Sequence, residues 1–241
     1  MPPLPPQNLK PIVANSSNFR YTAAMQVNAK VIDTSHFDNV ETSGTDWTGF
    51  AKVYAAGYRG VINKVTQGRG MVDTSYARRR GPALTNGLLY GAYHYFTTED
   101  PVQQANHFLA SAQIDDKTLM ALDHETRGVS LANARIFMET VKTQTGRYPW
   151  LYSGFLIKEQ LGNTIDPFWQ QIKLWLSHYN PNPTWPPCWT APTLWQFTGS
   201  IDEHTVAGPP PHQVPGIDIQ PGCDINSFDG TDDELTAIWA T

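Results

Sequence analysis

An Asp-x-Glu pair directly after an apolar run is the feature of this sequence best suited to catalysis. Asp123 and Glu125 follow the run Leu119-Met120-Ala121-Leu122, which is typical of a buried strand. Positions two apart on a strand face the same side, so both carboxyls would face one cavity. Like charges in a confined site raise one pKa. The result is one protonated acid beside one carboxylate, which glycosidic cleavage requires.

The spacing alone is common and more often marks a solvated pair, so its place after a strand carries the argument. Other apolar runs also end in polar residues, namely Asp33, Lys64, Tyr93-His94, Tyr152 and Asp224. In a (β/α) barrel the carboxyl ends of the strands share one face, which carries the chemistry. We therefore expect these distant side chains to converge with the Asp-x-Glu pair.

Histidines near these carboxylates leave a metal-dependent hydrolase as an alternative. Its ligands would come from Asp33, His36, His94, Asp123 and His124. Against this alternative, His124 would alternate away from its two acidic neighbours on a strand, and the chain has no HxxxH or HxH spacing. We predict no metal and no other cofactor.

Composition limits the remaining classes of function. The 241 residues suit one large domain, and a net charge of −5 without a basic stripe argues against nucleic acid. No apolar run is long enough to insert into a membrane. Aromatics make up 12% of residues and could line a groove or fill a core. The two cysteines, Cys188 and Cys223, do not make a disulfide framework, and whether they pair stays open.

The chain divides into an irregular N-terminal arm and one catalytic unit. Residues 1–29 hold five prolines, which disfavour regular structure, and lack the basic-then-apolar pattern of a signal peptide. From residue 30, apolar runs at 31–33, 60–64, 88–93, 119–122 and 150–152 alternate with helical patterns. Two further runs, 174–176 and 194–197, have prolines and no helix between them, and a last strand is expected to end near 223–224.

This order of elements predicts an α/β fold over residues 30–241. Alternation of strand and helix favours a parallel sheet, and eight strands favour closure into a barrel. Five strands are followed by helices and the alternation then breaks down, so the barrel should be irregular in its final third. A helix at 232–239 is expected to close the chain. We predict an irregular TIM-like barrel of five β/α units followed by three strands.

Several of these segments together resemble glycoside hydrolase family 25 lysozymes, the Chalaropsis-type muramidases. The ordered set comprises Val31–His36, Lys64–Gly68, Gly87–Phe96, Ala121–Glu125, Leu194–Phe197 and Cys223–Gly230. Each motif is weak by itself, but their order across residues 30–241 is specific. The resemblance implies hydrolysis of the β-1,4 bond between N-acetylmuramic acid and N-acetylglucosamine in bacterial peptidoglycan.

The resemblance also implies roles for particular residues. Glu125 falls at the family's general acid and Asp123 at its partner, with Asp33 and Asp224 at two further acidic positions of the cleft. The expected sugar-contacting residues are Tyr93, Tyr152, Trp195, Gln67 and His94. We expect retention of stereochemistry, with either a carboxylate or the substrate's own N-acetyl group as the nucleophile.

One position departs from the family pattern. Many members have Lys-Ala-Thr-Glu-Gly where this chain has Gln67, which keeps the shape but cannot ionise. A sugar-binding module that has lost catalysis is therefore a second alternative. The stretch 199–222 is also long and could form a loop over the cleft.

The sequence further suggests where such an enzyme would act. We expect action on the cell wall, in the periplasm or outside the cell, as a phage endolysin or a delivered antibacterial toxin. Because no signal peptide is visible, release would come through lysis or a dedicated secretion route. We expect a monomer, while a delivery or immunity protein remains an open question.

Overall fold

The computed structural model describes residues 25–202, 205–218 and 222–241, except for the side chains of residues 200–206. Eight strands form a closed barrel in the order β1-β3-β5-β6-β7-β8-β9-β12, because β1 pairs with both β3 and β12. Their bounds are β1 Ala29–Thr34, β3 Gly60–Gln67, β5 Leu89–Tyr95, β6 Leu119–Asp123, β7 Trp150–Ser153, β8 Leu174–Ser177, β9 Leu194–Asp202 and β12 Asp224–Ser227. The predicted irregular TIM-like barrel is confirmed.

The first five barrel strands are each followed by a helix, no helix follows β8 or β9 before the next barrel strand, and β12 is followed by the helix that ends the described chain. The helices are α1 Thr48–Ala55, α2 Ser75–Thr85, α3 Pro101–Ala112, α4 Leu131–Thr145, α5 Phe155–Leu161, the short α6 Pro167–Gln170 and α7 Asp232–Ile238. Side-chain caps fix several of their starts. The carboxylate of Asp100 accepts from the Gln103 amide before Pro101, and the Ser130 hydroxyl accepts from the Asn133 amide.

The direction of the last strand corrects one prediction. β12 begins at Asp224 instead of ending there, and it runs antiparallel to both β1 and β9. An antiparallel strand presents its first residue where its neighbours present their last, and Asp33 is the residue paired with Asp224. Asp224 therefore lies at the expected end of the barrel, although its strand runs in the opposite direction to the one predicted.

Four short strands were not predicted, because two or three residues show no readable alternation. They are β2 Asn39–Val40, β4 Met71–Val72, β10 Thr205–Ala207 and β11 Ile217–Asp218. β10 pairs with β9, and β11 pairs with β2. The described segments between residues 199 and 222 thus pair with β9 and with the short strand β2. None of their residues lines the pocket described below.

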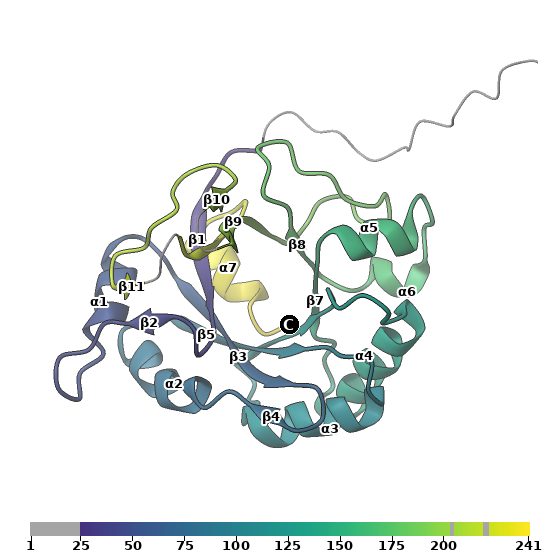
Figure 1. Ribbon diagram of the computed structural model, residues 1–241, viewed down its shortest axis with the longest axis horizontal. Coiled ribbons are helices and arrows are strands. Elements are labelled where there is room, and N and C mark those ends of the chain that lie inside the picture. The colour runs from purple at the N-terminus through teal and green to yellow at the C-terminus, as the bar shows by residue number, and fades with distance from the viewer. Residues whose placement is uncertain (1–24, 203–204, 219–221) are drawn as a thin grey trace, which may run out of the picture.

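The two faces of the barrel strands build two apolar layers. Outward residues such as Ile32, Val61 and Leu122 pack under the surrounding helices, whereas inward residues such as Val31 and Ile62 fill the barrel. Helix α7 belongs to the inner layer, and Figure 1 shows it within the ring of strands. Its Leu235 is buried, and the indole N–H of the adjoining Trp239 donates to the Tyr90 carbonyl at 3.2 Å. The helix therefore fills the end of the barrel opposite the strand ends that carry the polar residues.

The remaining sequence expectations concern the arm and the cysteines. Residues 1–24 lie outside the described part of the chain, but Met25 and Val27 pack on the outer layer. The Asn28 side chain donates to the Phe228 carbonyl at 2.9 Å, which joins the start of β1 to the end of β12. Cys188 and Cys223 are both free, buried thiols. Within the described ranges, the helices are too short or too polar to cross a membrane.

Candidate active site

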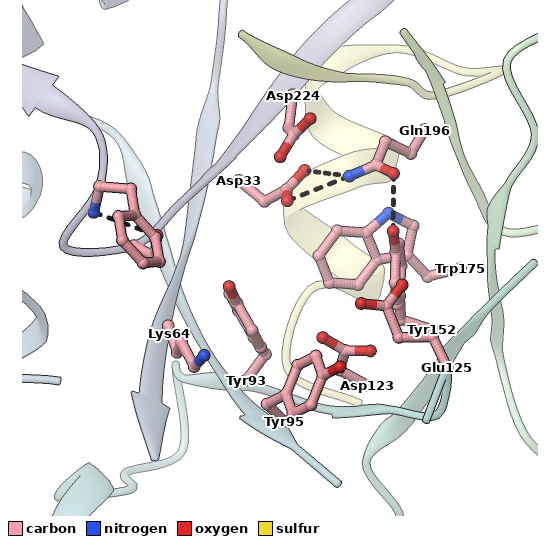
Figure 2. A pocket seen from close by; sticks show the side chains of 12 residues that line it. Asp33, Lys64, Tyr93, Tyr95, Asp123, Glu125, Tyr152, Trp175, Gln196 and Asp224 are labelled. Atoms are coloured by element: carbon pink, nitrogen blue, oxygen red, sulfur yellow. Dashed lines mark hydrogen bonds between the residues drawn. The ribbon is translucent and has the colours of Figure 1, made fainter. Parts of the chain in front are cut away.

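A pocket of about 190 Å³ lies at the carboxyl ends of the parallel strands. The residues that line it are Asp33, Ser35, Phe37, Lys64, Tyr93, Tyr95, Asp123, Glu125, Tyr152, Trp175, Gln196 and Asp224. Figure 2 shows most of these side chains around one cavity, with the four carboxyls contributed by three separate strands and the residues after them. Of the residues predicted to converge with the Asp-x-Glu pair, Asp33, Lys64, Tyr93, Tyr152 and Asp224 do so, whereas His94 does not line the pocket.

Strand alternation explains why these side chains meet. On β1 the inward positions are Val31 and Asp33, and on β6 the inward Ala121 is followed by Asp123. Along the strands the inward side chains thus change from apolar to polar towards the carboxyl end. The apolar ones close the barrel interior, and the next inward position opens to the pocket.

The four carboxyls differ in their exposure. Asp33 and Asp123 are buried, Asp224 is half-buried and Glu125 is exposed at the mouth. Burial raises the pKa of Asp33 to about 7, against the hydrogen bonds from Asn226 and Gln196. Burial and then the charge of Glu125 hold the pKa of Asp123 well above its usual range.

Glu125 and Asp224 share this tendency to hold a proton. The pocket walls raise the pKa of Glu125 by removing water around it, and Lys64 opposes that rise. Burial and the charge of Asp33 hold the pKa of Asp224 well above its ordinary value. Carboxyls that retain protons near neutral pH can serve as general acids, and a neighbouring ionised carboxylate can stabilise positive charge.

Lys64 brings an ammonium group to this acidic pocket. Its side chain is buried, and its Nζ donates to Gln67 Oε1 at 2.7 Å and lies over the Tyr95 ring. Burial lowers its pKa, whereas Asp123 raises it. Gln67 is not among the residues that line the pocket. Gln67 contacts the pocket through Lys64. Its neutral amide oxygen accepts a hydrogen bond from the Lys64 ammonium group and does not neutralise its charge.

A hydrogen-bond hub positions Asp33, and of its members the sequence had indicated Tyr152 alone. The amide oxygen of Gln196 accepts from the Tyr152 and Tyr179 hydroxyls, each at 2.8 Å. Its amide nitrogen donates to both Asp33 oxygens, at 3.0 and 3.1 Å. The Asn226 side chain donates to the same carboxylate at 2.8 Å. Figure 2 shows the Gln196 bonds from Tyr152 and to Asp33.

Trp175 was also missed as a lining residue, although its strand was predicted. It packs edge-on to Tyr152, with ring centroids 4.6 Å apart, and its indole N–H donates to Asn226 Oδ1 at 2.5 Å. The signal was present in the sequence, because Trp175 alternates with Leu174 and Leu176, which belong to the outer layer. Reading that alternation would have turned Trp175 inward.

Besides Gln67, two more of the expected sugar-contacting residues do not line the pocket. Trp195 is in the outer layer and its indole N–H donates to the His178 carbonyl at 2.9 Å. His94 is fully buried and stacks on Phe137 of α4 at 5.0 Å between ring centroids. Each is adjacent to an inward residue, Gln196 or Tyr93, so alternation turns it outward. We therefore no longer assign sugar contacts to Trp195 or His94.

The histidines of the metal alternative are dispersed. The His94 ring bonds to Thr66 and Gln104, the His124 ring to Gln160, and the His36 ring to Asp73. In the part of the chain that the structure describes, no cluster of three or more His, Cys, Asp or Glu side chains is arranged to hold a metal ion. The polar side chains that line the pocket are carboxyls, phenols, an amide, a hydroxyl and the Lys64 ammonium group, a set suited to proton transfer to and from an oxygen atom.

A barrel whose polar strand ends carry four carboxyls among aromatic rings fits the paired-carboxyl chemistry of glycoside hydrolases. Comparison with known proteins gives the family. The sequence profile of glycosyl hydrolases family 25 matches residues 32–205. The chain belongs to this family and is a glycoside hydrolase of the lysozyme type.

Individual relatives agree with this assignment. The chain is 31% identical over 206 residues to the uncharacterized protein YegX of Escherichia coli O157:H7. This aligned region covers 80% of this chain and 68% of that protein. A muramidase from Trichobolus zukalii superposes with a TM-score of 0.68 at 27% identity, covering 87% of this chain and 97% of that one. A lysozyme from Streptomyces coelicolor superposes with a TM-score of 0.71 over 89% and 98% of the two chains, and its 22% identity shows the shared fold alone.

Proposed function

We propose that this protein is an N-acetylmuramidase, which hydrolyses the β-1,4 bond between N-acetylmuramic acid and N-acetylglucosamine in bacterial peptidoglycan. The observation that carries the proposal is the meeting of Asp33, Asp123, Glu125 and Asp224 in one aromatic-lined pocket of a family 25 barrel. The substrate class follows from the family, and the position of the cut follows from the resemblance of the individual motifs.

Glu125 is the proposed general acid. It is exposed at the pocket mouth, where a glycosidic oxygen can reach it, and its raised pKa favours the protonated form needed at the start of the reaction. Glu125 gives its proton to the leaving oxygen as the bond to the anomeric carbon breaks. The resulting carboxylate later takes a proton from the water that attacks that carbon.

Asp123 is the proposed partner at the reaction centre. Within the described residues its Oδ1 is buried without a hydrogen-bond partner. An unused acceptor beside the acid suits the N–H of the substrate's acetamido group, whose carbonyl oxygen would then attack the anomeric carbon. This route retains stereochemistry through two inversions, as does direct attack by a carboxylate. The free Oδ1 favours the substrate-assisted route.

The other pocket residues hold these groups in place. Asp33 and Asp224 surround the reaction centre with further carboxyls, and the hub at Gln196 fixes the orientation of Asp33. Tyr93 and Tyr152 supply the aromatic walls of the groove. Gln67 acts on the substrate through Lys64. No step of this mechanism requires a metal ion or a cofactor.

The cleavage product tests the proposal. Purified peptidoglycan is incubated with the protein, the new reducing ends are reduced with borohydride, and the sugars are identified by mass spectrometry. Reduced N-acetylmuramic acid is expected. Reduced N-acetylglucosamine would make the protein a glucosaminidase, binding without cleavage would make it a sugar-binding module, and release abolished by a chelator would favour the metal-dependent hydrolase.

We further propose that the enzyme works on the wall as a phage endolysin or a delivered antibacterial toxin. Both settings place a peptidoglycan hydrolase in the periplasm or outside the cell, where its substrate is. Expression in a Gram-negative host with and without an added periplasmic signal sequence tests this proposal. Lysis is expected when the signal carries the protein to the periplasm. Absence of lysis at confirmed periplasmic expression would contradict action on the wall.

A further inference from the structure

Phe37 is the most exposed large apolar side chain of the described residues, with 78% of its surface accessible, and it lines the pocket. It lies between β1 and β2, in the chain that follows Asp33. A phenylalanine ring exposed to solvent at a pocket rim is not stabilised by burial of its apolar surface. A ligand with an apolar face would bury that surface on binding. Among the described residues, the close ring neighbour of Phe37 is the adjoining His36, with ring centroids 4.0 Å apart.

Buried charged groups hold the turn that presents Phe37. The guanidinium of Arg79 on α2 is buried and donates to the Ser35 carbonyl at 2.7 Å and to the Asp38 carbonyl. The Asp38 carboxylate accepts from the Ser35 amide at 2.6 Å, and the Asp38 amide donates back to the Ser35 carbonyl at 3.1 Å. Hydrogen bonds between Ser35 and Asp38 therefore close the turn, and the Arg79 guanidinium on α2 holds its two ends.

Asp73 fixes the turn from a second side. One of its carboxylate oxygens accepts from the His36 amide and contacts the His36 ring nitrogen, both at 2.8 Å. Although burial would raise the pKa of Asp73, its hydrogen bonds with Ser75 and His36 lower it, so the carboxylate stays charged. With its backbone held by Arg79, Asp38 and Asp73, the turn presents the Phe37 ring to solvent in a fixed place. A pre-organised ring loses little freedom when a ligand stacks on it.

The position of the turn on the barrel indicates what would stack there. β1 lies three strands round from β6, which leads to Glu125, with β3 and β5 between them. A glycan bound over Glu125 would therefore have to extend across the mouth before a sugar reached Phe37. The sugar at Phe37 would therefore not be one of the two sugars joined by the bond that is cut. The flat face of a pyranose ring, built of C–H groups, matches the face of the aromatic ring.

We propose that Phe37 is a stacking platform for a glycan sugar remote from the scissile bond, so that the enzyme prefers polymeric chains to short fragments. The inference rests on the proposed function for its substrate class, an N-acetylated hexose of peptidoglycan. Binding at such a site adds affinity without touching the reacting atoms. Its loss should appear in the Kd or KM for long chains and leave kcat nearly unchanged.

The test measures binding without cleavage. Peptidoglycan glycan fragments of two defined lengths are titrated by calorimetry into Glu125→Gln and into Glu125→Gln/Phe37→Ala. The Phe37 change should weaken binding of the longer fragment about tenfold, which corresponds to about 1.4 kcal/mol, and change binding of the shorter fragment less than twofold. Phe37→Trp should restore the affinity. Ile165→Ala serves as the control, because Ile165 is 58% exposed and does not line the pocket.

Two outcomes would overturn the platform. One is equal affinity of the longer fragment with and without Phe37. The other is equal weakening by Phe37→Trp and Phe37→Ala, which would mean that the change disturbs the turn and removes no stacking surface. Cleavage of both fragments by the wild type is recorded in parallel. Absence of cleavage there would count against the muramidase proposal, whereas the binding comparison would still decide the role of Phe37.

Discussion

Asp33, Asp123, Glu125 and Asp224 place four ionisable carboxyls around a pocket to which Lys64 brings an ammonium group. Each of the four has a pKa raised by burial, and for Asp33 the value is about 7. Since the groups interact, their protons leave in steps that belong to the cluster and not to one residue. The catalytic state must hold a proton on Glu125 and at least one charge beside it. Activity should therefore peak at mildly acidic pH.

Gln67 offers a way to shift that optimum. In Gln67→Glu a carboxylate would replace the amide that accepts from Lys64 at 2.7 Å, and it would partly neutralise the ammonium. With less positive charge nearby, the pKa of Glu125 should rise further, and the alkaline limb of kcat/KM should move up by roughly half a pH unit. The measurement is the pH profile of peptidoglycan hydrolysis by both proteins. An unmoved or lowered alkaline limb would show that Lys64 does not tune the acid.

At the scale of the elements, α7 supports the site from the other end of the barrel. Trp239, directly after it, is 1% exposed, and its ring lies against Gly60, where a side-chain Cβ would come within 2.6 Å of the indole. Trp239→Ala would leave a cavity costing about 3–5 kcal/mol, or a fall in Tm of roughly 6–20 °C. Trp239→Phe should lose less. Thermal unfolding followed by circular dichroism checks this, and a fall below about 2 °C for Trp239→Ala would contradict the role of α7 as a plug.

The elements also show what could be predicted from the sequence. Strand-helix alternation located the five β/α units and the three final strands, because each strand carries several apolar residues in a row. The direction of β12 was out of reach, since the pattern of a four-residue strand is the same in both directions. Gln196 and Asn226 were also missed as site residues, because their role comes from hydrogen bonds between strands far apart in sequence. Trp195 and His94 were misplaced because residue type was weighed above strand alternation.

At the scale of the whole molecule, several carboxyls are buried or half-buried in the pocket, where ionisation is unfavourable. This links the stability of the fold to pH. For Asp33 the folded-state pKa of about 7 lies above the ordinary value of 3.8, so the native protein binds more protons than the unfolded chain between these values. Stability is therefore lost as pH rises through this window, and the loss is complete above about pH 7. Asp123 and Asp224 act in the same direction. The Tm should increase as pH falls from 8 to about 6.5. Below that pH three histidines oppose the gain, because burial lowers their folded-state pKa values below the ordinary value of 6.5 and the unfolded chain binds their protons more readily. They are His94, His124 and His178.

Asp224→Asn tests the same linkage at a single residue. The amide removes a half-buried charge close to Asp33, so the variant should be more stable than the wild type at pH 8 by about 1 kcal/mol, or roughly 2–4 °C in Tm. The gain should shrink at pH 5, because the raised pKa of Asp224 favours the protonated wild-type carboxyl as the pH falls. Differential scanning calorimetry at the two pH values makes the comparison. A gain that is equal at both would mean that packing, and not charge, explains it.

The most direct test of the whole account is the effect of Glu125→Gln on the release of reducing N-acetylmuramic acid from purified peptidoglycan. Glu139→Gln is the matched control, because Glu139 lies exposed on α4 and pairs with Arg135. The wild type and the control should release the sugar at the same rate, and Glu125→Gln should be slower by about 10²–10⁴-fold without a fall in Tm. Equal release by Glu125→Gln would contradict the assignment of Glu125 as the general acid.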